Sequence, residues 1–452
     1  MANTYLQNTT TTATDTKKFT WSMWFKRSLL GSPAQRIWNI YADTNNKAQV
    51  AFNTDDQFSY FDKLGGSEVW SQTPKMKLRD TSAWYHIVVA VDTTQGTEAD
   101  RAKIYINGEL QTELEAGGSY PSINASTGTQ ITTSSNNRRI GSNESANTHF
   151  NGLISHLHFV DGQALAPTVF GETDSTSGIW TIKTAPSLTY GTNGFFILKD
   201  GNTITDSSPN SNNFALAGGT LTKTEDCPDN NFATLNPLYV INASQMPTLT
   251  NGNTTGTSTS SGYNSGVASI APAGSGKYYS EHKLISGTGG WNTNTLVGYS
   301  PTPNIIPNAP HDSNFFYGVL ADGGAKQGAT SRSGYAGTWT TGDIIRLALD
   351  LDNNRLYVGK NAYWSDGSGN WDEANINAYI NLAASPAVAG ENWFMMCGDK
   401  NTSTATWGNN FGNGYFGTTA VASAGTNASG NGIFEYDVPT GYTAISTKGL
   451  NL

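Results

Sequence analysis

Two histidines in this sequence stand at a spacing that could bind a metal ion. His156 and His158 lie two residues apart in a predicted strand, so both imidazoles would face the same side and could approach one zinc ion. No third ligand follows nearby, and His149 falls at or beyond the strand end. Because a histidine in a sheet more often serves packing than metal binding, we favour structural histidines and assign no metal site.

A pair of carboxylates, Asp350 and Asp352, has the spacing that acid–base catalysis could use. Glycoside hydrolysis needs two carboxyl groups about 5–10 Å apart, one of them with a raised pKa. These two residues, however, approach a predicted turn at Asn353-Asn354, where Asp commonly accepts local hydrogen bonds. The sequence also lacks a Gly-x-Ser-x-Gly elbow, a phosphate-binding loop and a Cys-His pair. We therefore expect no catalytic residues and no enzyme.

Aromatic residues flanked by Asn and Asp fit carbohydrate binding better. An aromatic ring can stack on the apolar face of a sugar, while amide and carboxylate groups hydrogen-bond its hydroxyls. Trp364 could instead belong to a core, and an exposed tryptophan could equally contact a protein partner. The candidate glycan- or partner-binding residues are Trp291, Asn292, Asn294, Tyr363, Trp364, Asp366 and Trp371.

Composition indicates an all-β protein with no nucleic-acid partner and no membrane-spanning segment. Only 13% of the 452 residues are charged, so Asn, Thr, Ser and Gly must supply the polar surface, and these residues favour turns and short strands. A net charge of -9 without a basic cluster argues against a nucleic-acid partner. No window approaches the roughly 18 apolar residues of a membrane span, and the first residues do not resemble a signal peptide.

The strands that carry a first sandwich alternate between apolar and polar positions. In the strand from Lys18, one face holds Phe19, Trp21, Met23 and Phe25. Asn107-Gly108 lies between two alternating runs and predicts a tight hairpin. From Leu153 to Val160 we expect strict alternation. The runs of this sandwich are KFTWSMWFK, QRIWNIY, AQVAF, WYHIVVAVD, KIYINGEL and LISHLHFV.

These runs resemble the laminin-G-like, or concanavalin-A-like, sandwich. The pieces that carry the likeness are FTWSMWFKRS, WYHIVVAVD, KIYINGEL, RRIG and FNGLISHLHFVDG. The continuation resembles a connecting block of tail-fibre-like and other structural proteins of marine bacteriophages, through DGQALAPTVFGE, SGIW, YGTNGFFILKD, ITDSSPNSNNF and CPDNNFATLNPL. Laminin-G relatives often bind calcium through loop Asp and Asn, so calcium stays open without assigned residues. Asp43, Asn45 and Asn46, or Asp366 and Asn370, are of the right kind.

The second half of the chain resembles the SPRY domain. The matching pieces are GKYYSEHKL, GDIIRLALDLD, RLYVGKNAYW and WGNNFG, and FEYDVPTGYTAIST is similar to the closing strand and turn of phage versions. The expected architecture is therefore all-β, with two concanavalin-A-like antiparallel β-sandwiches of jelly-roll type joined by a Gly/Asn/Thr-rich connector. The boundaries are residues 1–183 for the first sandwich, 184–262 for the connector and 263–452 for the second.

Cys227 and Cys397 could form a disulfide, although so few cysteines favour free thiols.

The resemblance implies a bacteriophage virion protein without enzymatic activity. Adhesion is favoured, as a tail fibre or knob that contacts host surface glycan or protein. The alternative is a capsid decoration, head-fibre or tail-adaptor protein that contacts only the virion, and a glycan depolymerase is the least supported reading. The implied partners are other virion proteins and host glycan, in a multi-copy or homo-oligomeric assembly. The implied localisation is the virion, made in the host cytoplasm and released by lysis.

Overall fold

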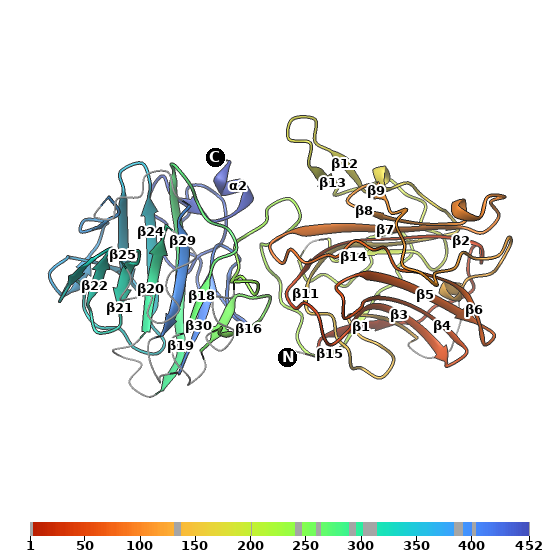
Figure 1. The fold of residues 1–452 in the computed structure, drawn as a ribbon, viewed down its shortest axis with the longest axis horizontal. Helices are drawn as coiled ribbons and strands as arrows, with labels where there is room; N and C mark the ends of the chain where they lie inside the picture. Colours follow the sequence, from red (N-terminus) through yellow and green to blue (C-terminus); the bar gives the residue numbers. More distant parts are fainter. Residues whose placement is uncertain are drawn as a thin grey trace. The chain divides into compact units, whose positions relative to one another are not determined.

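The chain folds into two units built almost entirely of strands (Figure 1). The computed structural model describes residues 3–130, 137–199, 201–239, 246–258, 264–288, 295–301, 314–383, 392–399 and 404–451. The units are Met1–Lys223 and Thr224–Leu452. In both, antiparallel sheets enclose a hydrophobic core, so the predicted all-β sandwich architecture is confirmed.

The first unit stacks two large sheets (Figure 1). Its strands are β1 Tyr5–Asn8, β2 Lys18–Arg27, β3 Gln35–Asp43, β4 Asn46–Phe52, β5 Phe58–Leu64, β6 Ser67–Gln72, β7 Trp84–Asp92, β8 Ala102–Ile106, β9 Glu109–Leu110, β10 Arg138–Ile140, β11 Gly152–Asp161, β12 Gly171–Thr173, β13 Trp180–Ile182, β14 Phe195–Ile197 and β15 Ala215–Gly218. As far as the chain is described, one sheet has the order β15-β1-β10-β3-β4-β5-β6 and the other β14-β11-β2-β7-β8-β9. β12 and β13 pair as a separate hairpin, and short 3-10 helices span Glu98–Asp100, Gly128–Gln130 and Pro167–Val169.

Both faces of β2 are buried, for different reasons. Phe19, Trp21, Met23 and Phe25 face the core between the two sheets, as the alternation predicts. The opposite face is also buried, because the chain after β11 returns over it and places Phe170 and Tyr190 in a second apolar cluster. The segment after β11, which includes Phe170 and Tyr190, is therefore part of the folded first unit.

A β-bulge in β11 overturns the strict alternation expected from Leu153 to Val160. Ser155 pairs with Trp24 and His158 with Ser22, so two residues of β11 stand opposite one of β2. The extra residue lets the backbone of His156 adopt a φ of 47°. As a result Ile154 packs against the same core as Leu157, which a strict period of two would forbid.

The division between the units differs from the predicted connector of residues 184–262. Its first part completes the first unit, since β14 pairs with β11 and β15 pairs with β1. Its later part belongs to the second unit, where β16 (Thr248–Thr250) and β17 (Thr255–Thr257) form a hairpin that extends a sheet. Low hydrophobicity suggested a linker, but Thr-rich segments can pair by backbone hydrogen bonds at a sheet edge.

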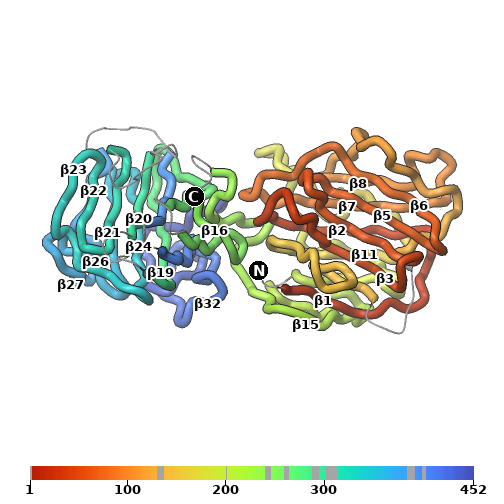
Figure 2. Tube along the Cα trace, turned by 60° about the horizontal axis from the view of Figure 1, so that its bottom comes forward, coloured from red at the N-terminus to blue at the C-terminus, as the bar shows by residue number. Residues whose placement is uncertain are grey.

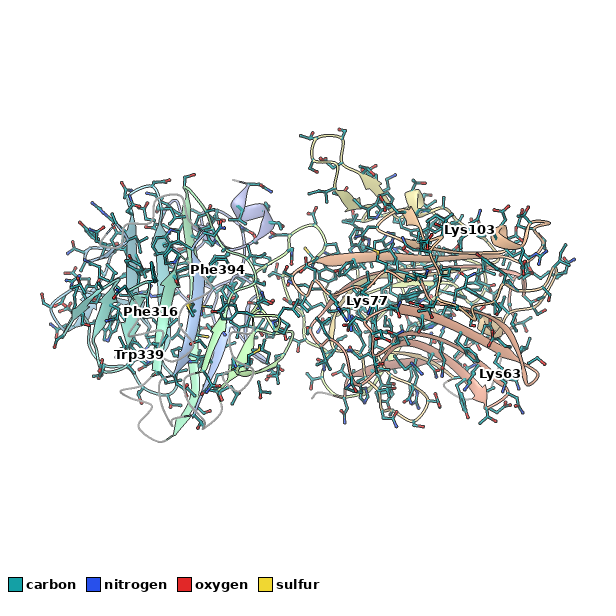
Figure 3. The ribbon with its side chains drawn as sticks, viewed as in Figure 1. Lys63, Lys77, Lys103, Phe316, Trp339 and Phe394 are labelled. Atoms are coloured by element: carbon teal, nitrogen blue, oxygen red, sulfur yellow. The ribbon has the colours of Figure 1, made fainter. Side chains whose placement is uncertain are left out.

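The second unit is also a layered β structure. Figure 3 labels Trp339, which belongs to its main core, and Phe316, which is buried in a separate small cluster. Its further elements are β18 Asn264–Val267, β19 Lys277–Thr288, β20 Thr295–Ser300, β21 Tyr317–Leu320, β22 Ala325–Gln327, β23 Thr330–Arg332, β24 Ile344–Asp350, β25 Arg355–Lys360, β26 Tyr363–Ser365, β27 Trp371–Glu373, β28 Ile380–Asn381, β29 Phe394–Asp399, β30 Thr404–Asn410, β31 Tyr415–Phe416, β32 Thr419–Ala420, β33 Thr443–Ala444 and α2 Thr447–Leu450. In the described ranges, the larger sheet has the order β16-β17-β30-β19-β24-β25-β26-β27, joined by β28 and β33. The other large sheet has the order β18-β29-β20-β21-β22-β23, and β31 pairs with β32.

Two faces of the larger sheet of the second unit have different environments. Leu347 and Leu349 of β24 point into the main core between the sheets. Ala348 points the other way, where a smaller cluster forms with Tyr279 and Tyr357. Residues 432–445, called the covering segment below, pack on this outer face through Phe434, Val438, Tyr442 and Ala444.

The predicted turns are confirmed. Asn107 and Gly108, with φ of 48° and 83°, join β8 to β9 in the left-handed conformations that such a hairpin needs. Asn354, with φ of 54°, lies in the turn between β24 and β25. Cys227 and Cys397 are free thiols, in agreement with the favoured reading.

Candidate functional site

Tyr363 and Trp364 are neighbours on β26, which lies beside β27, the last strand of the larger sheet of the second unit (Figure 2). Their side chains have different environments. The Tyr363 side chain is 52% exposed, whereas Trp364 is 4% exposed and belongs to the cluster on the outer face. Successive side chains of a strand point to opposite faces, which explains the difference. Trp364 is therefore buried in the cluster on the outer face, and Tyr363 offers the open aromatic ring.

Asp366 and Trp371 flank the loop between β26 and β27. One carboxylate oxygen of Asp366 accepts hydrogen bonds from the backbone N–H groups of Ser368 and Asn370, at 2.7 and 3.0 Å. The other accepts one from the Asn370 side chain, and these bonds lower the pKa of Asp366. Trp371 is half-buried, and its indole N–H donates to the carbonyl oxygen of Thr338 at 3.3 Å. Both side chains thus stabilise the edge of the sheet.

Three of the predicted site residues cannot be placed. Trp291, Asn292 and Asn294 lie outside the described residues, so their role as a sugar platform stays a prediction. The structure brings Tyr363, Trp364, Asp366 and Trp371 together on one hairpin, β26–β27, in which Trp364 pairs with Glu373 and Ser365 with Trp371.

A row of paired residues crosses four strands of the larger sheet on its outer face. Glu281 of β19 pairs with Arg346 of β24, which pairs with Gly359 of β25, which pairs with Trp364 of β26. Gly359 has no side chain, and a Cβ there would lie 3.0 Å from the Arg346 Nε atom and 3.0 Å from Trp364 Cε3. The glycine therefore lets the arginine and the tryptophan meet above it.

Arg346, in the middle of this row, has two guanidinium nitrogens without hydrogen-bond partners among the described residues. Its side chain is buried, with the residue 3% exposed, and the guanidinium carbon lies 4.2 Å from the centre of the Trp364 ring and 5.3 Å from that of Tyr436. In the described part of the chain, Nε and Nη2 have no hydrogen-bond acceptor. Buried N–H groups are rarely left so, because each unmet donor costs about 1–3 kcal/mol. Arg346 is not among the site residues predicted from the sequence.

Glu281 ties the covering segment to the sheet. Its carboxylate accepts hydrogen bonds from the backbone N–H groups of Glu435 and Tyr436, at 2.7 and 2.9 Å, and from the Tyr279 hydroxyl at 2.9 Å. Burial raises the pKa of Glu281 to about 7, although these hydrogen bonds and the nearby Arg346 act in the opposite direction. The Glu281 carboxyl group therefore gains or loses its proton near neutral pH.

In the first unit, the histidines lie in packed aromatic surroundings. The His86 ring stacks on Trp24 with centroids 4.8 Å apart, and its two nitrogens bond the Ser22 hydroxyl at 2.8 Å and the Trp180 N–H at 3.0 Å. Burial lowers the pKa of His86 to about 3. Trp180 comes from the β12–β13 hairpin, which Figure 1 shows beside β8 and β9. This arrangement fixes the hairpin to the sheet.

His156 and His158 show no geometry of a metal site. Nδ1 of His158 lies 2.9 Å from the Tyr190 hydroxyl, and its ring stacks on Phe196 with centroids 3.9 Å apart. Nδ1 of His156 lies 2.7 Å from the Ser155 hydroxyl. Across the described ranges, no group of three or more His, Cys, Asp or Glu residues could hold a metal ion. These contacts agree with structural histidines.

The calcium candidates are engaged within their own loops. Asp43 accepts hydrogen bonds from the Asn45 backbone at 2.7 Å and from the Asn46 side chain at 3.0 Å, in the turn between β3 and β4. Asp366 has the same kind of partners. Calcium binding stays an untested prediction.

Asp350 serves the turn at Asn353, as predicted, whereas Asp352 bonds backbone outside that turn. Asp350 accepts hydrogen bonds from the backbone and side chain of Asn353 and pairs with Lys277 at 3.3 Å. Asp352 accepts one from the Gly276 backbone at 2.8 Å. The Asp350 carboxylate thus holds its own turn, and the Asp352 carboxylate holds backbone that is distant in sequence.

Comparison with solved structures finds distant similarity to several β-sandwich proteins. The SPRY domain of human HERC1 is 16% identical over 37% of this chain and 89% of that domain, with a TM-score of 0.28. A heptameric SAP-like pentraxin from Limulus polyphemus is 15% identical over 36% of this chain and 72% of its own, with a TM-score of 0.25. Domains LG4-5 of the mouse laminin alpha1 chain are 9% identical over 88% of this chain and 87% of theirs, with a TM-score of 0.29.

The family comparison bears on the first unit. No curated protein matches the chain. Residues 1–169 match the family model described as the concanavalin A-like lectin/glucanases superfamily, of the laminin G type. The matched residues include β1 to β11, the strands that form most of both large sheets. The predicted SPRY likeness of the second unit stays a prediction, and the first unit has the concanavalin A-like, laminin-G-like fold.

Proposed function

We propose that this protein is a non-enzymatic structural protein of a bacteriophage virion, a tail-fibre or knob-type adhesin that contacts host surface glycan. The observation that carries the proposal is the match of residues 1–169 to the concanavalin A-like lectin/glucanases superfamily. Tyr363 adds an exposed aromatic ring of the kind that stacks on sugars. The low content of charged residues, 13%, is compatible with a surface that binds neutral polar groups.

The proposed absence of enzymatic activity is supported by the hydrogen bonds of the buried carboxyl groups, which are made to other parts of the protein. Burial raises the pKa of Asp62 to about 8 and of Asp399 to about 6. Such shifts also occur in glycosidases, where a second carboxylate must stand at a defined separation. Here Asp62 accepts the Gly128 backbone N–H at 2.7 Å, and Asp399 accepts the Ser258 hydroxyl at 2.6 Å. Each carboxyl group thus holds a neighbouring segment in place by a hydrogen bond, which is a structural role.

The virion assignment is supported by the resemblance of residues 161–238 to a connecting block of phage structural proteins. We propose other virion proteins as partners, in a multi-copy or homo-oligomeric assembly, and neither nucleic acid nor membrane. The acidic charge of -9 supports the first exclusion. Among the described residues, no helix has the length and apolarity to cross a bilayer.

Antibody labelling of purified virions with an antibody to this chain tests the proposal. Label at the tail tip or fibres is the expected result. Label spread over the capsid lattice would support the alternative of a decoration protein, and unlabelled virions would contradict a structural role. Release of reducing ends from host polysaccharide by the purified protein would contradict the absence of enzymatic activity.

A further inference from the structure

We propose that Arg346 forms a binding site for the carboxylate group of an acidic sugar, with Trp364 and Tyr436 as its aromatic walls. This inference rests on the proposed function for the glycan that carries the carboxylate. The site belongs to the second unit and to its sheet face under the covering segment, apart from the open ring of Tyr363.

The unpaired atoms of Arg346 have the geometry of one specific contact. Nε and Nη2 lie along one edge of the guanidinium plane, and neither has an acceptor within hydrogen-bond geometry among the described residues. The Tyr279 hydroxyl also interacts with the guanidinium, but it donates its own proton to Glu281. That edge carries two parallel N–H groups, the fork that takes the two oxygens of a carboxylate. Two unpaired donors on one edge of the guanidinium favour a ligand contact over a role in packing alone.

Two carboxylates that interact electrostatically with Arg346 accept their hydrogen bonds from other groups. Glu281 pairs with Arg346 across the sheet, but its oxygens accept the backbone N–H groups of Glu435 and Tyr436. Asp437 follows Tyr436, and its carboxylate accepts the backbone N–H and hydroxyl of Thr426, at 2.6 and 2.8 Å. The chain therefore builds a positively charged fork and directs its own carboxylates to other donors.

The charge of the surroundings selects a monoanion. One guanidinium stands beside Glu281 and Asp437, and the whole chain has a net charge of -9. A phosphate dianion would feel this negative field twice as strongly as a carboxylate does. The aromatic rings favour a ligand with an apolar face beside its charge, as a uronic acid has.

Access to the fork depends on Tyr436. The Arg346 residue is 3% exposed, and Tyr436 of the covering segment lies over the guanidinium. Tyr436 itself is half-buried and the next residue, Asp437, is exposed. The proposed site therefore requires the Tyr436 side chain to turn aside when the ligand binds, and Tyr436 is not part of the main core between the two sheets.

Calorimetric titration of the intact protein with glucuronate, glucose and acetate tests the site. We expect glucuronate to bind, glucose not to bind at this site, and acetate to compete weakly with glucuronate. Arg346→Lys keeps the positive charge but removes the fork, so its affinity for glucuronate should fall at least tenfold. Arg355→Lys is the matched control, because Arg355 also lies over a tyrosine ring, 4.4 Å from the centre of Tyr379. It should leave the affinity unchanged.

Several outcomes would overturn the site. They are no binding of glucuronate by the wild-type protein, equal losses in the two arginine variants, or binding of acetate without glucuronate, which would assign the fork to a small ion. If the Arg346→Lys variant does not fold, the wild-type comparison of glucuronate with glucose still decides. Binding of neutral glycans without any effect of the carboxylate would leave the proposed adhesin function standing and remove this site alone.

Discussion

The guanidinium of Arg346 lies 4.2 Å from the centre of the Trp364 ring, across a position of the sheet that has no side chain. Gly359 occupies that position, between the two residues in the pairing order. The contact joins β24 to β26 over the intervening β25, and the covering segment closes it from outside through Tyr436. The contact that joins these three strands and the covering segment thus needs a residue without a side chain at Gly359.

Gly359→Ala should destabilise the second unit by about 1–3 kcal/mol, the usual cost of inserting an atom into a packed site. Its Cβ would stand 2.9 Å from the Tyr363 carbonyl oxygen and 3.0 Å from the Arg346 Nε atom. Urea unfolding followed by tryptophan fluorescence measures the change. Gly96→Ala is the control, since a Cβ at Gly96 meets no atom within 4 Å. Equal midpoints for Gly359→Ala and the wild type would show that the contact does not need the glycine.

Trp364→Ala and Tyr363→Ala form a matched pair on adjacent residues. Truncating the buried Trp364 should cost about 3–5 kcal/mol of unfolding free energy, because a cavity remains. Truncating the exposed Tyr363 should change it by no more than about 0.5 kcal/mol. Chemical denaturation of both variants checks the difference. Similar losses would mean that Tyr363 also packs against the fold.

The stability of the second unit should respond to pH through Glu281. Its pKa is raised to about 7 in the folded protein, so the folded state holds a proton that the unfolded state releases near the usual value of 4.5. Stability from this group is present below pH 4.5 and is lost as the pH rises to about 7, with a full range of about 3 kcal/mol. His282, whose pKa burial lowers to about 4, acts with the opposite sign.

Glu281→Gln isolates this contribution, because glutamine does not titrate. Its unfolding free energy, measured from pH 5 to pH 7, should lack the decline that Glu281 adds to the wild type. Asp372→Asn, at an exposed carboxylate of β27, serves as the control and should keep the wild-type slope. Identical slopes in all three proteins would contradict a buried Glu281 that titrates near neutrality.

Acid should weaken the first unit through His86. Its pKa is lowered to about 3 by burial, so the folded state keeps the ring neutral while the unfolded state takes up a proton below about pH 6.5. At pH 5 this difference in pKa lowers the unfolding free energy of the first unit by about 2 kcal/mol. His86→Gln can keep the bonds to Ser22 and Trp180 and should show a smaller loss between pH 7 and pH 5. An unchanged loss would place the acid sensitivity elsewhere.

The sequence predicted the sandwiches because alternation and turns are local signals. Phe19 and Trp21 on one face of β2, and Asn107-Gly108 at a hairpin, follow from residue type and spacing alone. The bulge at His156 and the pairing of β14 with β11 did not, since both depend on strands distant in sequence. The Thr-rich segment from Thr248 was taken for a linker for the same reason.

The candidate site was predicted only in part. Tyr363 and Trp364 were named together, but which of them is exposed depends on which face of β26 meets the covering segment. Arg346 carried a usable signal, as the lone charge within the apolar run Ile344–Leu349. A charge so placed either pairs inside the fold or serves a ligand. Only the pairing of β24 with its neighbours shows which aromatic residues surround it.

The most direct test of the account is a glycan array probed with the intact protein, with Tyr363→Ala and with Tyr379→Ala beside it. Tyr379 is the control, since its side chain is also exposed, at 39%, but its ring lies under Arg355. We expect the wild-type protein and Tyr379→Ala to bind a defined class of glycan, and Tyr363→Ala to lose at least tenfold in signal. An array on which the wild-type protein binds nothing would contradict the adhesin account.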